Sequence, residues 1–150
     1  MGDNRVEPAA GIGDLSAILG LHVRLAHGAI RRHFTASGTG AALTQKQVSV
    51  LWFIGSNTGA AQTHVAKQLQ IDRASVMSIV NHLQGQGLVE RTPSTGDGRR
   101  QALILTHKGG IALSAAQATI ANHEAWLRAR FTAAEVTQLI ALLTRIHSPK

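Results

Sequence analysis

The sequence contains no cysteine and no tyrosine, and aromatic residues make up only 3% of its 150 residues. Without cysteine, the chain cannot form disulfides, thiolate-ligated zinc sites or thiol-based redox sensors. Because aromatics are scarce, Leu, Ile, Val and Ala must supply the core. This composition suits packed helices.

Long hydrophobic runs are also missing. No apolar stretch approaches the roughly 20 residues that a membrane-spanning helix needs. The polar segment 1–10 lacks the pattern of a signal peptide. We therefore expect a cytoplasmic protein with no membrane partner. The sequence also lacks the phosphate-binding loop, the nucleophile elbow and the His-Glu-x-x-His pattern, so we expect neither enzymatic activity nor a cofactor.

Acidic residues are few, with 8 Asp and Glu against 15 Lys and Arg, and the formal net charge is +7. Such an excess favours an anionic partner, with nucleic acid ahead of an anionic membrane surface. A sequence-independent nucleic-acid binder is therefore one alternative. The eight His residues raise a second alternative, a metal-responsive regulator. Their spacing shows no cluster of ligands, however, and we predict no metal site.

Hydrophobic periodicity predicts a first helix over about 14–36, after a flexible arm at 1–13. Thr44 opens a capping-box pattern, in which a hydroxyl and a Gln or Glu three residues later satisfy each other's backbone amides. The helix that follows is apolar on nearly all sides, so we expect it to be central and buried, ending near 57–59.

Two short helices and a hairpin are expected next. A helix over 62–69 should bury its Val, Ala and Leu positions, and Asp72 should cap a helix that runs to about residue 86. Strand-like runs at 88–91 and 101–105 flank a basic, turn-rich tip.

Two helices complete the chain, one from about residue 106 into the Trp126 region and one after a second capping box at Thr132. The last helix is amphipathic over 136–146. The predicted fold is mainly α, with a single domain at 14–150.

A pair of short helices followed by a basic hairpin is the order of a winged helix-turn-helix. The wing signature of the MarR family (multiple-antibiotic-resistance regulators) is matched by Asp97 and Arg99, then, after five intervening residues, by Leu105 and Thr106, and after two more by Gly109. The sequence resembles that family from Leu43 to about Leu113. The resemblance implies a winged helix-turn-helix at about 43–105, flanked by dimerisation helices at about 14–36 and 106–147. It also implies a homodimeric transcription regulator that binds a pseudo-palindromic site in double-stranded DNA.

The core stripe of the second short helix leaves a polar outward face. The residues predicted to face DNA there are Arg73, Ser75, Met77, Ser78, Asn81 and His82. Arg73 can bond guanine or a phosphate, and Asn81 can contact adenine with both amide atoms. Gln62 and Thr63, at the start of the preceding helix, are candidates for phosphate contacts. A solvated polar face is the alternative for each position.

The resemblance places Arg99 in the minor groove, oriented by Asp97, with Arg100 as a further wing contact. Four positions depart from the family pattern. Met77 and His82 replace residues that are often Ser and Arg. Ala61 stands where a capping hydroxyl is common, and Gln70 stands in the turn where Gly is usual. If the backbone at Gln70 is left-handed, the residue is strained.

The resemblance further implies a small anionic effector, such as an aromatic carboxylate or its coenzyme A thioester, between the dimerisation and DNA-binding parts. The candidate effector residues are His22, Arg31, Arg32, His33 and Trp52. For Trp52 we favour an ordinary core position over stacking on a ligand. The expected mechanism is repression relieved by the effector.

Overall fold

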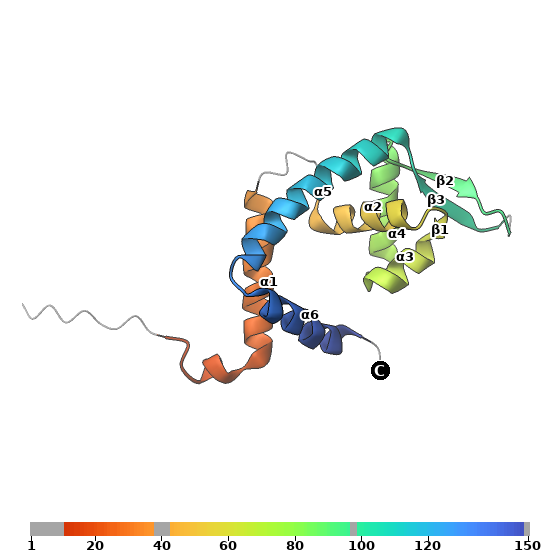
Figure 1. The fold of residues 1–150 in the computed structure, drawn as a ribbon. Helices are drawn as coiled ribbons and strands as arrows, with labels where there is room; N and C mark the ends of the chain where they lie inside the picture. The colour runs from red at the N-terminus through yellow and green to blue at the C-terminus, as the bar shows by residue number, and fades with distance from the viewer. Residues whose placement is uncertain (1–10, 38–42, 97–98, 149–150) are drawn as a thin grey trace, which may run out of the picture.

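The computed structural model describes residues 11–37, 43–96 and 99–148. Its elements are, in chain order, the 3-10 helix η1 (Gly13–Ala17), α1 (Leu19–Ala36), α2 (Gln45–Ser56), β1 (Ala60–Ala61), α3 (Gln62–Leu69), α4 (Arg73–Gly85), β2 (Val89–Pro93), β3 (Gln101–Leu105), α5 (His107–Arg128) and α6 (Ala133–His147). The long helix α5 runs from the small sheet to α1, so that α1, α6 and the end of α5 form an arm beside the α2–α4 and sheet unit (Figure 1). The order of four helices, a hairpin and two helices is confirmed, and so is the mainly α winged helix-turn-helix fold.

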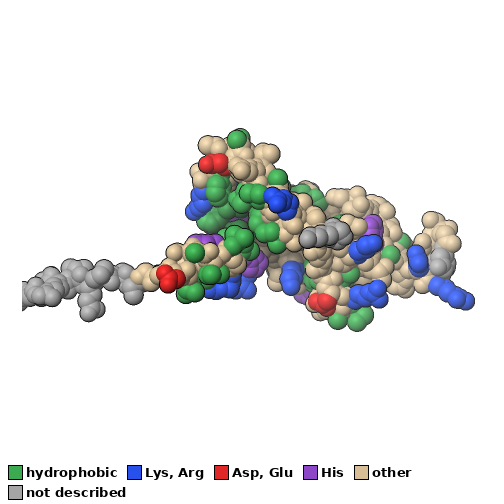
Figure 2. All heavy atoms as spheres, turned by 90° about the horizontal axis from the view of Figure 1, so that it is seen from below, with side chains coloured by type: hydrophobic (Ala, Val, Ile, Leu, Met, Phe, Trp, Pro, Cys, Tyr) green, Lys and Arg blue, Asp and Glu red, His purple; other side chains and the backbone are tan. Residues whose placement is uncertain are grey.

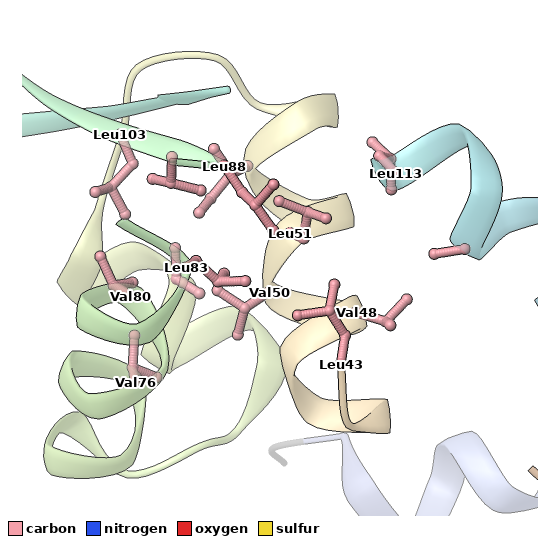
Figure 3. Close-up of a cluster of buried hydrophobic side chains, with 14 of the residues drawn as sticks. Leu43, Val48, Val50, Leu51, Val76, Val80, Leu83, Leu88, Leu103 and Leu113 are labelled. Atoms are coloured by element: carbon pink, nitrogen blue, oxygen red, sulfur yellow. The ribbon is translucent and has the colours of Figure 1, made fainter. Parts of the chain in front are cut away.

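The core lies where α2 crosses α4 and the sheet. Val50 and Leu51 of α2, Val80 and Leu83 of α4, and Leu103 of β3 are almost completely buried there (Figure 3). Each such side chain contributes about 1.5–3 kcal/mol by leaving water. Because this core joins α2, α4 and the hairpin, it fixes α4, the second helix of the helix-turn-helix, relative to the hairpin.

Capping determines where several helices begin. The capping boxes of Thr44 with Gln47 and of Thr132 with Glu135 are both formed, as predicted. The α3 helix begins after Ala61 with no side-chain cap, which agrees with the departure noted there. The hairpin of β2 and β3 pairs Val89 with Leu105 and extends to Pro93.

Several sequence predictions need correction. The first helix is broken at Ile18, whose extended backbone separates η1 from α1. The first wing strand is Val89–Pro93 instead of 88–91, because pairing with β3 continues to Pro93. A third strand, β1, adds to β3 as an edge and had no signal in the sequence. Trp52 is not a core residue, since 37% of its surface is exposed.

Candidate DNA-binding interface and effector site

The recognition helix α4 begins at a tightly made cap. The Oδ1 atom of Asp72 accepts a hydrogen bond from the backbone N–H of Ser75 at 2.8 Å, and its Oδ2 atom accepts one from the Ser75 hydroxyl at 2.6 Å. These two bonds, the hydroxyl first, lower the pKa of Asp72. The hydroxyl proton of Ser75 is thus used inside the cap, so Ser75 does not offer a donor to DNA in this arrangement.

The outward face of α4 is otherwise as the periodicity predicts. Val76, Val80 and Leu83 are buried on one side of the helix. The other side exposes the remaining five predicted residues, Arg73, Met77, Ser78, Asn81 and His82. The predicted first-helix contacts lie next to this face, because Gln62 and Thr63 share a groove of about 310 Å³ with Arg73, Ala74 and Met77.

A second, larger and more basic groove runs from α3 toward the wing. It encloses about 760 Å³, and Lys67 of α3, Arg73 of α4 and Arg100 of the wing contribute cations to its lining. Asp72 supplies one acidic group. The three elements therefore bring positive charge to one side of the helix-turn-helix, which suits a polyanionic ligand.

The hairpin presents the predicted wing arginines. Arg99 and Arg100 are exposed at its tip, where the Ser94 N–H donates to the Arg100 carbonyl at 2.8 Å. Asp97 lies outside the described residues. Thr106 and Gly109, the end of the signature, anchor the wing at its base. The Thr106 hydroxyl donates to the Gly87 carbonyl at 2.6 Å and accepts from the Gly109 N–H at 2.9 Å.

Arg91 of β2 was not singled out from the sequence, yet it joins three elements of this surface. Its Nη2 atom donates to Asn81 Oδ1 of α4 at 2.8 Å and to Gln62 Oε1 of α3 at 3.2 Å. Its Nη1 atom donates to Gln84 Oε1 of α4. The only sequence signal for Arg91 was its place at the end of the Gly-Leu-Val-Glu-Arg segment. A local sequence motif does not indicate which distant side chains an arginine contacts.

Gln70, which stands where the family usually has Gly, has a left-handed backbone with φ at 51°. Among non-glycine residues, this conformation costs about 1–2 kcal/mol. The side chain compensates in part, because its Nε2 donates to the His147 carbonyl at 2.7 Å. The turn between α3 and α4 is thereby tied to the last turn of α6.

The candidate effector residues do not gather at one place. The His22 ring hydrogen-bonds the Ser16 carbonyl at 2.7 Å, near the start of the arm. Arg31 and Arg32 are exposed on α1. His33 faces α5 instead, where its ring stacks on Trp126 with 3.8 Å between ring centroids.

His123 and Trp126 complete this aromatic cluster, and neither was predicted as a site residue. His33 Nδ1 and His123 Nδ1 lie 2.8 Å apart in a hydrogen bond. The guanidinium of Arg130 lies 3.8 Å from the Trp126 ring centroid, a cation–π contact. His123 is buried, and burial first, then the charge of His33, lowers its pKa. Nothing in the local sequence indicates that residues 90 positions apart would stack.

Within residues 11–37, 43–96 and 99–148, no three His, Asp or Glu side chains are grouped so that they could hold a metal ion. None of the helices in these ranges combines the length and the apolar character needed to traverse a bilayer.

The fold and the polar face of α4 beside a basic hairpin define a winged helix-turn-helix regulator. A family model described as MarR family matches residues 43–100. A Thauera aromatica protein described as a putative transcriptional regulatory protein for the hcr operon is 32% identical over 136 residues, which are 90% of this chain and 82% of that protein. The chain belongs to the MarR family of transcription regulators, which are not enzymes.

Solved structures agree with this assignment. The transcriptional repressor CouR bound to a 23-mer DNA duplex is 31% identical, with a TM-score of 0.86 over 93% of this chain and 99% of that one. CouR from Rhodococcus jostii RHA1, solved with p-coumaroyl-CoA, has a TM-score of 0.82 over 92% of this chain and 97% of that one. At 22% identity, this second likeness concerns the fold alone.

Proposed function

We propose that this regulator is a homodimeric repressor that covers a pseudo-palindromic operator and leaves it when a small anionic effector binds. The observation that carries the proposal is the exposed polar face of α4 beside a hairpin that bears Arg99 and Arg100. An α-helix of this kind fits the major groove, and an arginine on the adjacent hairpin suits the narrower minor groove. Lys and Arg side chains stand out toward the wing end of the molecule (Figure 2).

Dimerisation is supported by apolar surface on the arm. The α6 helix has no buried residue, although Leu139, Ile140, Leu143 and Ile146 follow its apolar stripe. The η1–α1 segment likewise exposes Leu15, Ile18, Leu19, Val23 and Leu25. Hydrophobic side chains gather over this arm in Figure 2. A contiguous apolar surface of this kind marks a protein interface, and a two-fold dimer would set the recognition helices roughly 34 Å apart, one turn of DNA.

For the effector we propose an aromatic acid or its coenzyme A thioester. Arg31 and Arg32 supply exposed cations on α1 at the two positions before His33, whose ring stacks on Trp126, and the Arg130 guanidinium lies over the Trp126 ring. Cations beside aromatic rings suit an anion with an aromatic body. An effector can release the operator only if it binds the DNA-free state more tightly than the DNA-bound state.

The DNA-binding part is tested by fluorescence anisotropy on duplex enriched from a randomised library by the wild-type protein, over a salt series. Arg99→Ala should weaken binding about tenfold or more and flatten the salt slope by about 1 per protomer, with an unchanged dimer by light scattering. Arg128→Ala is the charge-matched control, because Arg128 sits at the far end of α5 in an exposed pair with Glu124. Equal affinities for the two variants would overturn the wing assignment.

The same assay separates the alternatives. A specific regulator should prefer its enriched duplex over bulk DNA by about a thousandfold or more. The net charge of +7 also allows a sequence-independent binder. Such a protein should be displaced from the enriched duplex and from a random duplex by the same concentration of competitor DNA. Benzoate and benzoyl-CoA are suitable first probes for release, and Arg32→Ala should weaken the response to either. A release curve that Arg32→Ala leaves unchanged would remove α1 from the effector site.

A further inference from the structure

The guanidinium of Arg91 hydrogen-bonds three neutral amide side chains, and because it can only donate, it determines which atom of each amide faces it. A guanidinium carries five N–H donors and no acceptor. The atoms that Gln62, Asn81 and Gln84 turn toward Arg91 must therefore be their carbonyl oxygens. Since each amide carries its NH₂ on the other arm of the same planar group, all three amides direct their donors away from the guanidinium.

The backbone holds this arrangement from three sides. Arg91 is the third residue of β2, paired with Leu103, and is half-buried. Asn81 and Gln84 are three residues apart on α4 and so share one side of that helix. Gln62 is the first residue of α3. A single guanidinium thus links the wing strand, the recognition helix and the first helix of the pair.

We propose that Arg91 is a positioning residue for DNA recognition, which holds Asn81 as a hydrogen-bond donor so that it selects acceptor edges. The proposal rests on the proposed function, in which the exposed face of α4 reads DNA. Reading adenine with both amide atoms requires the Asn oxygen to accept from the base. In this structure Arg91 engages one of the two lone pairs of that oxygen and turns the oxygen toward the guanidinium, while the side chain of Asn81 is exposed.

The consequence for readout differs from the expectation drawn from sequence. An outward NH₂ group can donate to purine N7, to guanine O6, to thymine O4 or to a phosphate oxygen. It distinguishes guanine from cytosine, which presents a donor in the major groove. We therefore expect Asn81 to favour guanine over cytosine at its contact position and to show no requirement for the adenine amino group.

The test is selection from a randomised duplex library with wild-type protein, Arg91→Lys, Asn81→Ala and Asn81→Asp, followed by anisotropy on the enriched duplexes. Lysine keeps the charge, but its single ammonium cannot reproduce a planar fork toward three oxygens. Arg91→Lys should lose the same base preference as Asn81→Ala, by about tenfold, with an unchanged salt slope. Arg128→Lys, the same substitution at a remote exposed site, should keep the preference.

The Asn81→Asp variant gives an independent reading, because it keeps the oxygen facing Arg91 and removes the donor. We expect its preference to move from guanine to cytosine, whose amino group donates. If Asn81→Asp kept the wild-type preference, or if Arg91→Lys did, the positioning role would be overturned while sequence-specific binding stood. If the wild-type protein enriched no sequence, the proposed function would fail together with this inference. Should Arg91→Lys unfold by circular dichroism, the Asn81→Asp result decides.

Discussion

Two adjacent glycines at the start of α5 should respond in opposite ways to the same substitution. A Cβ atom on Gly109 would overlap the carbonyl oxygen of Leu88 and lie 2.9 Å from its carbonyl carbon. Ordinary contacts between heavy atoms lie at about 3.5–4.0 Å. The obstacle is backbone at the base of the wing, and that carbonyl also accepts from the Thr106 N–H at 3.1 Å. Relief therefore requires α5 to move away from β2.

The magnitude follows from two opposing effects. Overpacking costs about 1–3 kcal/mol and occasionally more, and backbone opposition places Gly109→Ala at the upper end. Replacing a helical glycine by alanine returns about 0.5–1 kcal/mol. We expect a net loss of about 2 kcal/mol for Gly109→Ala. A Cβ atom on Gly110 would have no heavy atom within 4 Å from elsewhere in the described part of the chain, so Gly110→Ala should gain about 0.5–1 kcal/mol.

The assay is thermal unfolding by circular dichroism at one protein concentration, since the Tm of a dimer depends on concentration. At about 2–4 °C per kcal/mol for a chain of this size, the two variants should differ by roughly 5–12 °C. Equal Tm values for Gly109→Ala and Gly110→Ala would refute the reasoning, because they would show that the Leu88 contact does not exclude a side chain. A loss in both variants would instead show that the whole first turn tolerates no change.

Three further predictions concern titration, capping and strain. The pKa of His123 is lowered from its ordinary 6.5, so as the pH falls the unfolded chain binds the proton before the folded chain does. The contribution of His123 to stability should be full above about pH 6.5 and should be lost at lower pH. In thermal unfolding measured over a pH series, His123→Asn should reduce the loss of Tm toward acid pH, and an unchanged pH dependence would exclude His123 as its source. Asp72→Ala should lower the Tm and weaken DNA binding, because the Ser75 amide loses its acceptor; Asp72→Asn, which can still cap, should restore most of the Tm. Gln70→Gly should raise the Tm by relieving the left-handed backbone, yet speed hydrogen exchange in the last turn of α6, where the bond to His147 is lost; slower exchange there would contradict the tether.

The sequence was a good guide wherever a local signal decided the structure. The cap at Asp72 and the boundaries of α3 were read correctly, because capping and a short amphipathic stripe depend on neighbours within one or two turns. Where a decision depended on distant partners, prediction failed. The two-residue strand β1 exists only because Ala60 and Ala61 pair with β3, some forty residues later. Trp52 looked like a core residue because its helix is apolar on many sides, but although α2 packs against α3, α4, α5 and β3, the part of its surface that carries Trp52 stays exposed.

The candidate sites divide along the same line. The outward face of α4 follows from periodicity, so Arg73, Met77 and Asn81 were placed correctly as exposed. Which atoms those side chains can offer was not predictable, because Ser75 gives its proton to Asp72 and Asn81 turns its oxygen to Arg91. The aromatic cluster on α5 depends on the crossing of α1 and α5, which no local pattern encodes.

The signature at the end of the wing shows how a spacing in the sequence becomes a constraint on the interface. The Thr106 hydroxyl caps α5 by accepting from the Gly109 N–H, and it closes the wing base by donating to the Gly87 carbonyl. Gly109 then packs against Leu88, at the point where the wing strand begins. The three-residue interval is one helical turn, the spacing at which one hydroxyl reaches the N3 amide. Because Leu88 leads directly into β2, the same turn of α5 fixes the start of the strand that carries Arg91 over α4, and the orientation of the Asn81 amide, which accepts from Arg91, therefore depends on the base of the wing.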